Sequence, residues 1–588
     1  MALGSLAPHT PSGVGEYSPP VREYEFLLSE VFGEDLVARA TGGELSTDDA
    51  VDALEGAGEF ASQILAPLNR IGDTDGVRLI DGQAVTPDGF REAYRSFTDA
   101  GWITAMQGPS SGGDGLPNSV RQALTEFWNG SNLGFALLAL LSSGQIHALD
   151  ACASEELRET FMKRLVSGEW TGTMNLTEPQ AGSDLGAITS IARRNGDGTW
   201  SVSGQKIFIS WGDHDLAENI VHLVLARTEG APEGHRGLSL FIVPKFHVGA
   251  DGSIGARNAV ETVAIEHKLG LHASPTCVLQ FNGAVGHLVG ELHAGLQGMF
   301  VMMNAARIGV GVQGLAVAER AYQRARDYAY QRLQGRVLDL PTGTPIAGHP
   351  DVRRLLLSIS SRISAMRAFS VMVGDQMDRA EAAGNTGPEQ TLLEFYVPLF
   401  KSWLTESSVQ IASDALQVHG GAGYVEETGA AQHFRDARIL PIYEGTTAIQ
   451  SNDLVGRKVL RDGGATAAQV FAAIRESLDS LRGSDHPVAR RVAERTERAV
   501  QSAERATRAV LEFAASPRDA YAVSVPFQEL LATLIGGQMH ARMVGAVLAH
   551  ETLTDEDQRR LTEADFFGAH HLSNVHALAE AVAAGEIV

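Results

Sequence analysis

Two short segments near the two-thirds point of the chain carry its most distinctive pattern: Gln417-Val-His-Gly-Gly-Ala-Gly-Tyr424 and Ile442-Tyr-Glu-Gly-Thr446. The paired glycines of the first segment let the backbone approach a ring system closely, and the glycine of the second does the same beside Glu444. Each segment also has an ordinary interpretation, because glycines often end helices and a lone loop glutamate is usually solvated. Since both patterns occur together within 30 residues, we favour a functional interpretation.

These segments resemble the signature of the acyl-CoA dehydrogenases, flavoenzymes that introduce an α,β double bond into an acyl thioester. The resemblance implies that Glu444 is the catalytic base and that Gln417, Gly420 and Gly421 line the flavin, FAD. Removing a proton next to a thioester carbonyl needs a carboxylate within hydrogen-bond reach of that carbon. A dry pocket suits this carboxylate, because burial raises its pKa toward that of the carbon acid.

The segment Thr177-Glu-Pro-Gln-Ala-Gly-Ser-Asp184 resembles a second pattern of the family. The resemblance implies that Thr177 and the backbone near Leu176 hydrogen-bond the pyrimidine edge of the isoalloxazine, with Met174 beside them. Donors at that edge favour hydride acceptance, because a reduced flavin gains negative charge there. Ser183 is expected to contact a flavin phosphate or the pantetheine arm of CoA. A tight turn after a strand is the structural alternative, but it does not account for the whole match.

The strand Gly204-Gln-Lys-Ile-Phe-Ile-Ser210 resembles the family strand whose aromatic residue and following hydroxyl lie against the flavin. Phe208 and Ser210 take these places. The family often has tryptophan at the aromatic position, and phenylalanine keeps the stacking face but loses a donor. A half-buried strand without flavin contact is the alternative for Phe208.

Besides Ser183, two further residues, Ser274 and Arg307, are expected on the substrate side. Ser274, in a segment from Glu266 to Cys277 that resembles the end of the family's β domain, is expected to hydrogen-bond CoA. A serine before proline also commonly serves a turn. Arg307 matches an arginine that orders the region of the base in relatives.

Arg332 and Gln334 lie in Arg332-Leu-Gln-Gly-Arg336, which resembles the family segment that grips the FAD pyrophosphate, often from a neighbouring subunit. The planar guanidinium suits phosphate oxygens, whereas the alternative for Arg332 is an interaction with the dipole of the preceding helix. Gly445 is expected to contact substrate. Thr446 is expected to touch the phosphate arm of FAD at a helix N-terminus, where free N–H groups favour phosphate.

Other cofactor patterns find no support. The glycine-rich segments do not form Gly-x-Gly-x-x-Gly after a strand, so a dinucleotide-binding Rossmann unit is not indicated. His570, His571 and His576 lack the spacing of a helical metal pair. We therefore expect surface histidines and no metal.

Composition limits the function classes. A chain of 588 residues is too long for one core, so several domains are expected. The net charge of -24 argues against nucleic acid and anionic membrane surfaces as partners. Cys152 and Cys277, the two cysteines, exclude a disulfide framework and favour a reducing cytoplasm. Both are predicted to be small core residues.

No membrane-spanning segment or signal peptide is predicted. In the uncharged stretch Asn129–Leu149 the apolar part, Phe135–Leu141, is much shorter than the roughly 20 residues of a span. The segment Met1–Pro20 is rich in Gly, Ser and Pro and lacks a basic region followed by an apolar core. It is interpreted as a mobile arm that packs on a neighbouring subunit.

Periodicity predicts a multidomain α+β fold with helical, β and again helical parts, followed by a further helical region at the C-terminus. This series resembles the layout of the acyl-CoA dehydrogenases, and the additional C-terminal helical domain resembles that of their extended bacterial subfamily. Short β-type runs separated by turns, with a hairpin signal at Asn195–Gly198, occupy the middle of a chain that is otherwise helical. Long helices are expected over 302–330, 351–377, 391–418 and 446–460. The predicted parts are an N-terminal arm (1–20), an N-terminal helical domain (21–170), a middle β domain (171–285), a helical flavin and catalytic domain (286–460) and an additional helical domain (461–588).

The resemblance therefore implies an FAD-dependent acyl-CoA dehydrogenase of fatty-acid β-oxidation type, which passes electrons to an electron-transferring flavoprotein. Two subfamilies with the extended tail differ in substrate: medium- to long-chain acyl-CoA, or the short thioether 3-methylmercaptopropionyl-CoA. The run Met299–Leu315 resembles the second more closely. Alternatives are an acyl-CoA oxidase, a DNA-associated flavoprotein of the alkylation-response type, and a scaffold without flavin. The tail is not basic, since residues 456–588 hold 15 Lys and Arg against 18 Asp and Glu.

The tail also bears on assembly. Apolar stripes over Gln501–Ala515 and Gln528–Ala549 have to be buried against another surface. In extended relatives the tail covers the face on which a second dimer would dock, so a homodimer is expected, with a homotetramer as the alternative.

Overall fold

The computed structural model describes residues 17–249 and 251–586, so the predicted N-terminal arm lies almost wholly outside the described residues. The chain forms two compact units. The first, here the helical unit, contains the described residues up to Ser62, Pro117–Gly130, and the chain from Val310 onward. The second, here the β unit, contains Gln63–Leu116 and Ser131–Gly309. The five predicted parts were defined from sequence patterns along the chain, whereas these two units are defined by which residues pack together. The units do not test the five predicted boundaries, which stay a prediction.

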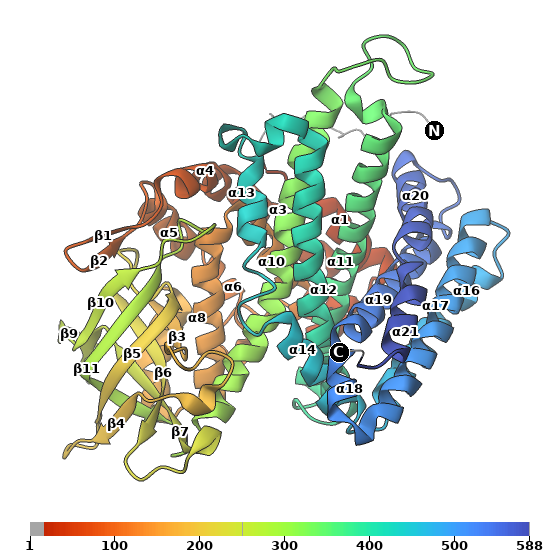
Figure 1. The fold of residues 1–588 in the computed structure, drawn as a ribbon. Helices are drawn as coiled ribbons and strands as arrows, with labels where there is room; N and C mark the ends of the chain where they lie inside the picture. Colours follow the sequence, from red (N-terminus) through yellow and green to blue (C-terminus); the bar gives the residue numbers. More distant parts are fainter. Residues whose placement is uncertain (1–16, 250, 587–588) are drawn as a thin grey trace. The chain divides into compact units, whose positions relative to one another are not determined.

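The β unit is built on a seven-stranded sheet (Figure 1). The strand order is β10-β11-β5-β4-β6-β3, and β7 pairs with both β11 and β6. β3 and β4 run parallel to β6, and the other pairs are antiparallel. The strands of the sheet are β3 (Trp170–Asn175), β4 (Ile191–Arg194), β5 (Trp200–Ser210), β6 (Asn219–Thr228), β7 (Leu238–Pro244), β10 (Val260–Ile265) and β11 (Thr276–Val289), and a separate hairpin holds β8 (Phe246–Val248) and β9 (Ile254–Arg257).

The predicted change to β structure at Trp170 is confirmed, because β3 begins there. The predicted hairpin is confirmed as well: β4 and β5 pair antiparallel, and the Asn195 N–H donates to the Thr199 carbonyl over 2.8 Å. Alternating side chains of β5, β6, β7 and β11 form the core of the sheet, with Phe241 and Phe281 almost wholly buried. Cys277 belongs to this core, as predicted, whereas Cys152 at the end of helix α8 (Leu133–Cys152) is only half-buried, so the prediction for Cys152 is wrong.

Helices complete the β unit. The long helix α8 packs against β3, and Gly172 permits this approach, because an added Cβ would lie 2.2 Å from the Gln145 side chain. A two-stranded hairpin of β1 (Arg78–Ile80) and β2 (Gln83–Val85) corrects the prediction that residues 21–170 are helical throughout. The helices are α4 (Ala66–Asp75), α5 (Phe90–Asp99), α6 (Trp102–Ala105), α8 (Leu133–Cys152) and α9 (Glu155–Ser167), with the short turns η4 (Pro109–Ser111), η5 (Leu185–Ala187) and η6 (Gly234–Gly237).

The helical unit centres on three long helices. These are the second part of α10 (Gly295–Gln331), α11 (Pro350–Ala382) and α12 (Gly387–His419), all longer than predicted. A buried ion cluster joins them to the N-terminal segment: Arg367 contacts Glu126 at 2.7 Å and Glu319 at 2.8 Å, and Tyr24 donates to Glu126. Removing one member of such a cluster costs about 3–5 kcal/mol, because it leaves a buried charge uncompensated.

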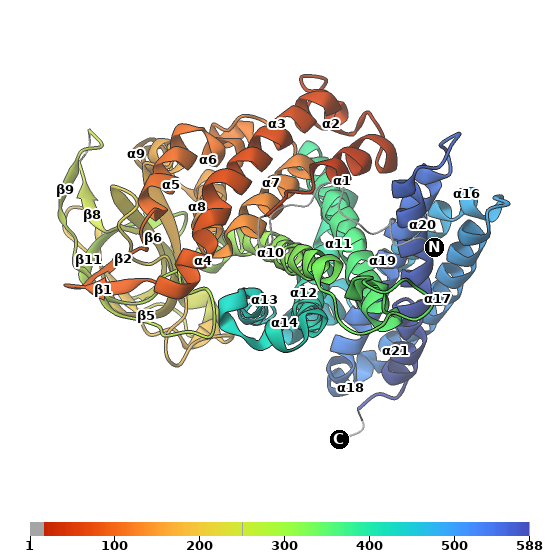
Figure 2. The same ribbon diagram turned by 90° about the horizontal axis from the view of Figure 1, so that it is seen from above.

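The remaining elements of the helical unit include both termini of the described chain (Figure 2). In sequence order they are α1 (Val21–Phe26), η2 (Leu27–Val31), α2 (Leu36–Ala40), α3 (Thr47–Phe60), α7 (Asn118–Ser131), η7 (Ile346–Gly348), η8 (Gly420–Tyr424), η9 (Glu426–Thr428), α13 (Ala430–Ala437), α14 (Thr447–Asp453), η10 (Leu454–Val459), α15 (Ala465–Ser477), α16 (Asp479–Arg482), α17 (Pro487–Glu512), η11 (Phe513–Ala515), α18 (Pro517–Ala522), α19 (Ser524–Val547), α20 (Asp555–His570) and α21 (Asn574–Ala583); the π-turn η3 (Ala61–Leu65) links the two units. The predicted helix 446–460 is thus a short α-helix continued by a π-helix.

Within the C-terminal region, α17, α19, α20 and α21 pack on one another, as Figures 1 and 2 both show. The apolar stripe predicted over Gln528–Ala549 lies on α19, which packs against α11, α12 and α14 of the same chain. The tail is therefore joined closely to the helices that follow the middle β domain.

Three helices are long and apolar enough to cross a membrane by length and composition alone: α8, α10 and α11. Most of each apolar stretch is buried inside the protein, from 61% in α8 to 89% in α11. The apolar part of α8 is also longer than the predicted 135–141. Core packing accounts for these stretches, and the absence of a membrane-spanning segment stays a prediction.

Candidate functional site

The loop between α13 and α14 carries Glu444 in a strained conformation. Glu444 has φ of 54° and Gly445 has φ of 93°, so the backbone is left-handed at both residues. Such a conformation costs of order 1–3 kcal/mol at a non-glycine residue and persists only where the surroundings enforce it. Glycine suits this position, because an L-residue with a side chain is strained at that φ and an added Cβ would also displace the Gln450 amide, 2.5 Å away. The loop is therefore held in one shape at the predicted catalytic base.

A buried lysine of α12 holds both ends of this loop. The Lys401 ammonium donates to the Leu440 carbonyl over 2.9 Å and to the Gly445 carbonyl over 2.8 Å. Lys401 is fully buried, and hydrogen bonds from a charged donor are stronger than neutral ones. The predictions from sequence missed Lys401, because it lies more than 40 positions before Glu444 and acts on backbone carbonyls.

Further bonds fix the residues on either side of Glu444. The Tyr443 hydroxyl donates to Gln313 of α10 over 2.5 Å, and the Gln450 amide donates to the Glu444 carbonyl over 3.2 Å. Burial, together with the nearby Glu444 and Asp436 carboxylates, raises the pKa of Tyr443. Tyr443 is therefore a hydrogen-bond donor at neutral pH, and Glu444 itself is half-buried.

Thr446 is the N-cap of α14, since its hydroxyl accepts from the Ile449 N–H over 3.3 Å. The predicted helix start is confirmed, and the contact of Thr446 with a phosphate stays a prediction. Gln417 is exposed in the last turn of α12, which ends at His419, and Gly420 is the C-cap with φ of 60°. The helix-capping interpretation is thus confirmed for Gly420. Side chains added at Gly420 or Gly421 would meet no atom within 4 Å, so the backbone there is open to a ligand as well.

Arg332 and Gln334 follow the last residue of α10 and are exposed. The Gln334 carbonyl accepts from His349 over 2.9 Å, which fixes the turn. The Arg332 guanidinium is thereby presented on the surface of the helical unit.

In the β unit, the segment after β3 lies against β5. The Ile207 N–H donates to the Thr177 carbonyl over 2.9 Å, and the Lys206 ammonium donates to the Leu176 carbonyl over 2.9 Å. Lys206 and Glu178 form a buried ion pair at 2.9 Å. Burial lowers the pKa of Lys206 to about 8, whereas Lys206, Ser190 and Thr189 outweigh burial and lower the pKa of Glu178 to about 2. This pair was not predicted, although both residues stand inside the quoted motifs.

The structure therefore brings Leu176 and Thr177 beside Phe208. Phe208 is 59% exposed and has φ of 59°, a strained arrangement that points to function rather than to packing. The hydroxyls of Thr177, Ser183 and Ser210 form no hydrogen bond with other residues of the described chain. Met174 is half-buried near the end of β3. These donors and the aromatic face are available to a ligand.

Ser274 and Arg307, which were also predicted on the substrate side, are placed less openly. Ser274 is 1% exposed, and its hydroxyl has no hydrogen-bond partner among the described residues. Its contact with CoA stays a prediction, as does the role of Arg307, which contacts Asn304 over 3.2 Å and belongs to the β unit.

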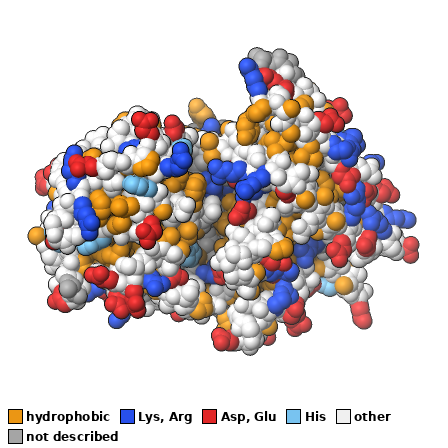
Figure 3. Space-filling model, turned by 90° about the horizontal axis from the view of Figure 1, so that it is seen from below, with side chains coloured by type: hydrophobic (Ala, Val, Ile, Leu, Met, Phe, Trp, Pro, Cys, Tyr) orange, Lys and Arg blue, Asp and Glu red, His pale blue; other side chains and the backbone are white. Residues whose placement is uncertain are grey.

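Other chemistry finds little support. Within residues 17–249 and 251–586 no group of His, Cys, Asp and Glu could hold a metal ion. The prediction that His571 is a surface residue is wrong, because His571 lies half-buried against Ser358. Burial raises the pKa of Cys277 to about 12, so this thiol is inert. On the face shown in Figure 3, Lys and Arg side chains lie in separate groups among Asp and Glu.

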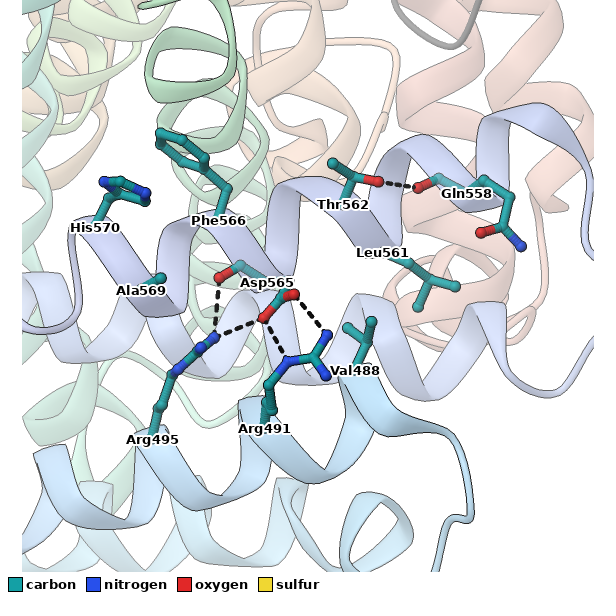
Figure 4. A pocket seen from close by; sticks show the side chains of 10 residues that line it. All are labelled: Val488, Arg491, Arg495, Gln558, Leu561, Thr562, Asp565, Phe566, Ala569 and His570. Carbon is teal, nitrogen blue, oxygen red and sulfur yellow. Dashed lines mark hydrogen bonds and ion pairs between the residues drawn. The ribbon is translucent and has the colours of Figure 1, made fainter. Parts of the chain in front are cut away.

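A hollow of about 340 Å³ lies between α17 and α20 (Figure 4). Its two arginines, Arg491 and Arg495, both point to Asp565 and contact it at 2.6 Å. The single Asp565 carboxylate balances one of their two positive charges.

The comparisons with known proteins agree with this geometry. The pattern described as acyl-CoA dehydrogenase, middle domain, matches residues 173–284; acyl-CoA dehydrogenase, C-terminal domain, matches 293–459; and acetyl-CoA dehydrogenase C-terminal like matches 467–587. The chain is 46% identical over 564 residues to 3-methylmercaptopropionyl-CoA dehydrogenase of Ruegeria pomeroyi, which covers 94% of this chain and 95% of that protein. It is 35% identical to the broad-specificity linear acyl-CoA dehydrogenase FadE5 of Mycobacterium tuberculosis over 80% of each chain.

Solved structures share the fold. Caenorhabditis elegans ACDH-11 in complex with C11-CoA aligns with a TM-score of 0.76 at 19% identity, over 95% of this chain and 93% of that chain. An acyl-CoA dehydrogenase of Bacillus anthracis complexed with FAD aligns with a TM-score of 0.74 at 20% identity, over 93% and 90%. The chain belongs to the acyl-CoA dehydrogenase family. It is an FAD-dependent oxidoreductase, and the predicted fold class is confirmed.

The residues present fit FAD. In the β unit the open aromatic face of Phe208 and the donors Thr177 and Ser210 suit an isoalloxazine. In the helical unit the open backbone at Gly420 and Gly421 and the exposed Arg332 suit its phosphate and nucleoside parts.

Proposed function

We propose that this enzyme oxidises 3-methylmercaptopropionyl-CoA to the corresponding 2-enoyl-CoA. The observation that carries the proposal is the 46% identity, over almost the whole of both chains, to a dehydrogenase of that substrate. The relative with broad specificity for linear acyl-CoA is 35% identical over 80% of this chain. A linear acyl-CoA of medium length is therefore the competing substrate class.

The reaction needs a base at the carbon next to the thioester carbonyl. Glu444 takes the α-proton, and its fixed loop conformation keeps the carboxylate in place for that step. Lys401 and Gln313 hold the loop from two sides, so little reorganisation is needed during proton transfer. Bound FAD supplies the acceptor for the hydride that leaves the β-carbon.

The electrons then leave the enzyme. The proposed acceptor is an electron-transferring flavoprotein rather than oxygen. The expected homodimer, the cytoplasmic location and the absence of nucleic-acid and membrane partners are part of the same proposal, and the net charge of -24 supports the last.

The test is anaerobic bleaching of the bound flavin by acyl-CoAs. The matched pair is 3-methylmercaptopropionyl-CoA and pentanoyl-CoA, which differ only by sulfur in place of one methylene group. Butyryl-, octanoyl- and palmitoyl-CoA extend the series in length. We expect the thioether to reduce the flavin with the highest rate divided by dissociation constant, by about tenfold or more over pentanoyl-CoA, the range that small differences in a pocket produce.

A maximum at octanoyl- or palmitoyl-CoA would replace the substrate proposal with the linear acyl-CoA class. Reoxidation of the reduced flavin in air tests the acceptor. Reoxidation as fast as turnover would make the enzyme an oxidase.

A further inference from the structure

The C-terminal domain contacts the two helices that hold the catalytic loop. Helix α19 packs against α12, which carries Lys401, and against α14, which begins directly after Thr446. All three helices belong to the helical unit. A residue of α19 that bonds both neighbours would therefore couple the C-terminal domain to the position of Glu444.

Gln528 is such a residue. Its amide donates to the Pro398 carbonyl of α12, and its carbonyl oxygen accepts from the Ser451 hydroxyl of α14. Gln528 is 2% exposed and Ser451 fully buried. Pro398 stands inside α12, one turn before Lys401. The two bonds thus tie Gln528 to α12 near Lys401 and to α14 near its start at the Glu444 loop.

Neighbouring contacts strengthen the same junction. The Ser524 hydroxyl, one turn before Gln528, lies 2.9 Å from the Asn452 side-chain oxygen of α14. The backbone at Gly456 approaches Tyr521 so closely that an added Cβ would lie 2.6 Å from its hydroxyl. On the other side, Thr447 donates to Glu406 of α12 over 2.5 Å. The helix after the base is therefore fixed from both α12 and the C-terminal domain.

We infer that Gln528 is a positioning residue for the dehydrogenation, through which the C-terminal domain sets the placement of the Glu444 loop. Gln528 fixes α14 relative to α12, and Lys401 of α12 fixes the loop carbonyls. A shift of one helix against the other moves Glu444 relative to the substrate carbon. The inference rests on the proposed role of Glu444 as base.

The substitution Gln528→Leu removes both bonds and keeps a side chain of similar size. It leaves few unsatisfied groups, because Ser451 retains the Thr447 carbonyl at 2.6 Å and the Pro398 carbonyl stays within α12. The matched control is Gln538→Leu, also a buried glutamine of α19, ten residues further along. Stopped-flow flavin reduction at saturating acyl-CoA reports the chemical step, and its concentration dependence reports binding.

We expect Gln528→Leu to lower the saturating reduction rate by about tenfold, since a misplacement of the order of 1 Å lowers rates by up to a hundredfold. FAD content and the apparent dissociation constant of acyl-CoA should stay within about twofold, and Gln538→Leu should match the wild type. Ser451→Ala, which removes one of the two bonds, should lower the rate by a smaller factor, and it replaces Gln528→Leu if that variant does not purify.

An unchanged reduction rate in Gln528→Leu, or in Ser451→Ala where it stands in, would overturn the inference. Equal losses in Gln528→Leu and Gln538→Leu would also overturn it, because the effect would then be one of general stability. Bleaching of the wild-type flavin by acyl-CoA and its loss in Glu444→Gln are measured alongside. If these two fail, the proposed function fails, whereas a failure confined to Gln528 leaves that function standing.

Discussion

Replacing Lys401 by methionine tests how the base is held. The substitution removes two hydrogen bonds, to the Leu440 carbonyl at 2.9 Å and to the Gly445 carbonyl at 2.8 Å. Hydrogen bonds from a charged donor contribute about 1.5–3 kcal/mol each, so the loop loses about 3–6 kcal/mol of stabilisation. Removing the buried ammonium also removes its desolvation cost, which offsets part of this loss. The strained φ of Glu444 costs of order 1–3 kcal/mol, so the loss is large enough to let the loop relax.

We therefore expect Lys401→Met to retain FAD and lower the rate of anaerobic flavin reduction by about a hundredfold, the scale set by a shift of about 1 Å. Stopped-flow absorbance with saturating acyl-CoA measures this rate, and thermal unfolding checks the fold. The control is Lys458→Met, which breaks the ion pair with Glu394 at the start of α12. Such a partly exposed pair contributes about 0–1 kcal/mol, so the control should reduce its flavin at nearly the wild-type rate. A Lys401→Met rate within about threefold of wild type would refute the argument.

Three further predictions concern cofactor, pH and assembly. Arg332→Ala should purify with less FAD and regain activity at high added FAD; full FAD occupancy, measured by absorbance, would favour the helix-end interpretation of Arg332. The His550 ring donates hydrogen bonds to the Glu30 and Asp557 carboxylates, and these bonds raise the pKa of His550 above its usual value. The stabilising effect of His550 is therefore fully present below about pH 6.5 and is lost as pH rises through the raised pKa. The melting temperature of His550→Gln should then fall below that of wild type at pH 5.5 and converge with it above neutrality, and a constant difference would contradict this. Sedimentation of the intact protein should give a homodimer, and a tetramer mass would overturn the expected role of residues 461–588.

Periodicity predicted the long helices because their apolar faces are buried over many turns. The helix expected over 302–330 spans Gly295–Gln331, and its first residues were missed because Gly295 and Gly298 are poor helix formers. At Gly295 the glycine is required by packing, since an added Cβ would lie 2.4 Å from the Ser239 backbone. Local propensity does not contain such a contact.

The hairpin of β1 and β2 was missed although its signal is present. Asp81-Gly82 separates two short apolar runs, and both residues have positive φ, 50° and 76°. Asp-Gly with this geometry is the preferred two-residue hairpin turn. The helical pattern on either side hid it.

The candidate site divides in the same way. Glu444, Thr177 and Phe208 stand in contiguous motifs, so their sequence neighbours identify them. Lys401 bonds a backbone carbonyl 44 positions away in the sequence. Gln528 bonds the Ser451 hydroxyl, 77 positions away, and the Pro398 carbonyl, 130 positions away. No local pattern marks a residue whose partner is a distant backbone oxygen, and only the fold shows that α12, α14 and α19 meet beside the loop.

The most direct test of the central claim is flavin reduction by acyl-CoA in Glu444→Gln. The glutamine keeps the size of the side chain and removes the base. We expect the variant to bind FAD and acyl-CoA normally, while its flavin is reduced at least about 10²- to 10⁴-fold more slowly than in the wild type. Reduction of the Glu444→Gln flavin at nearly the wild-type rate would contradict the account.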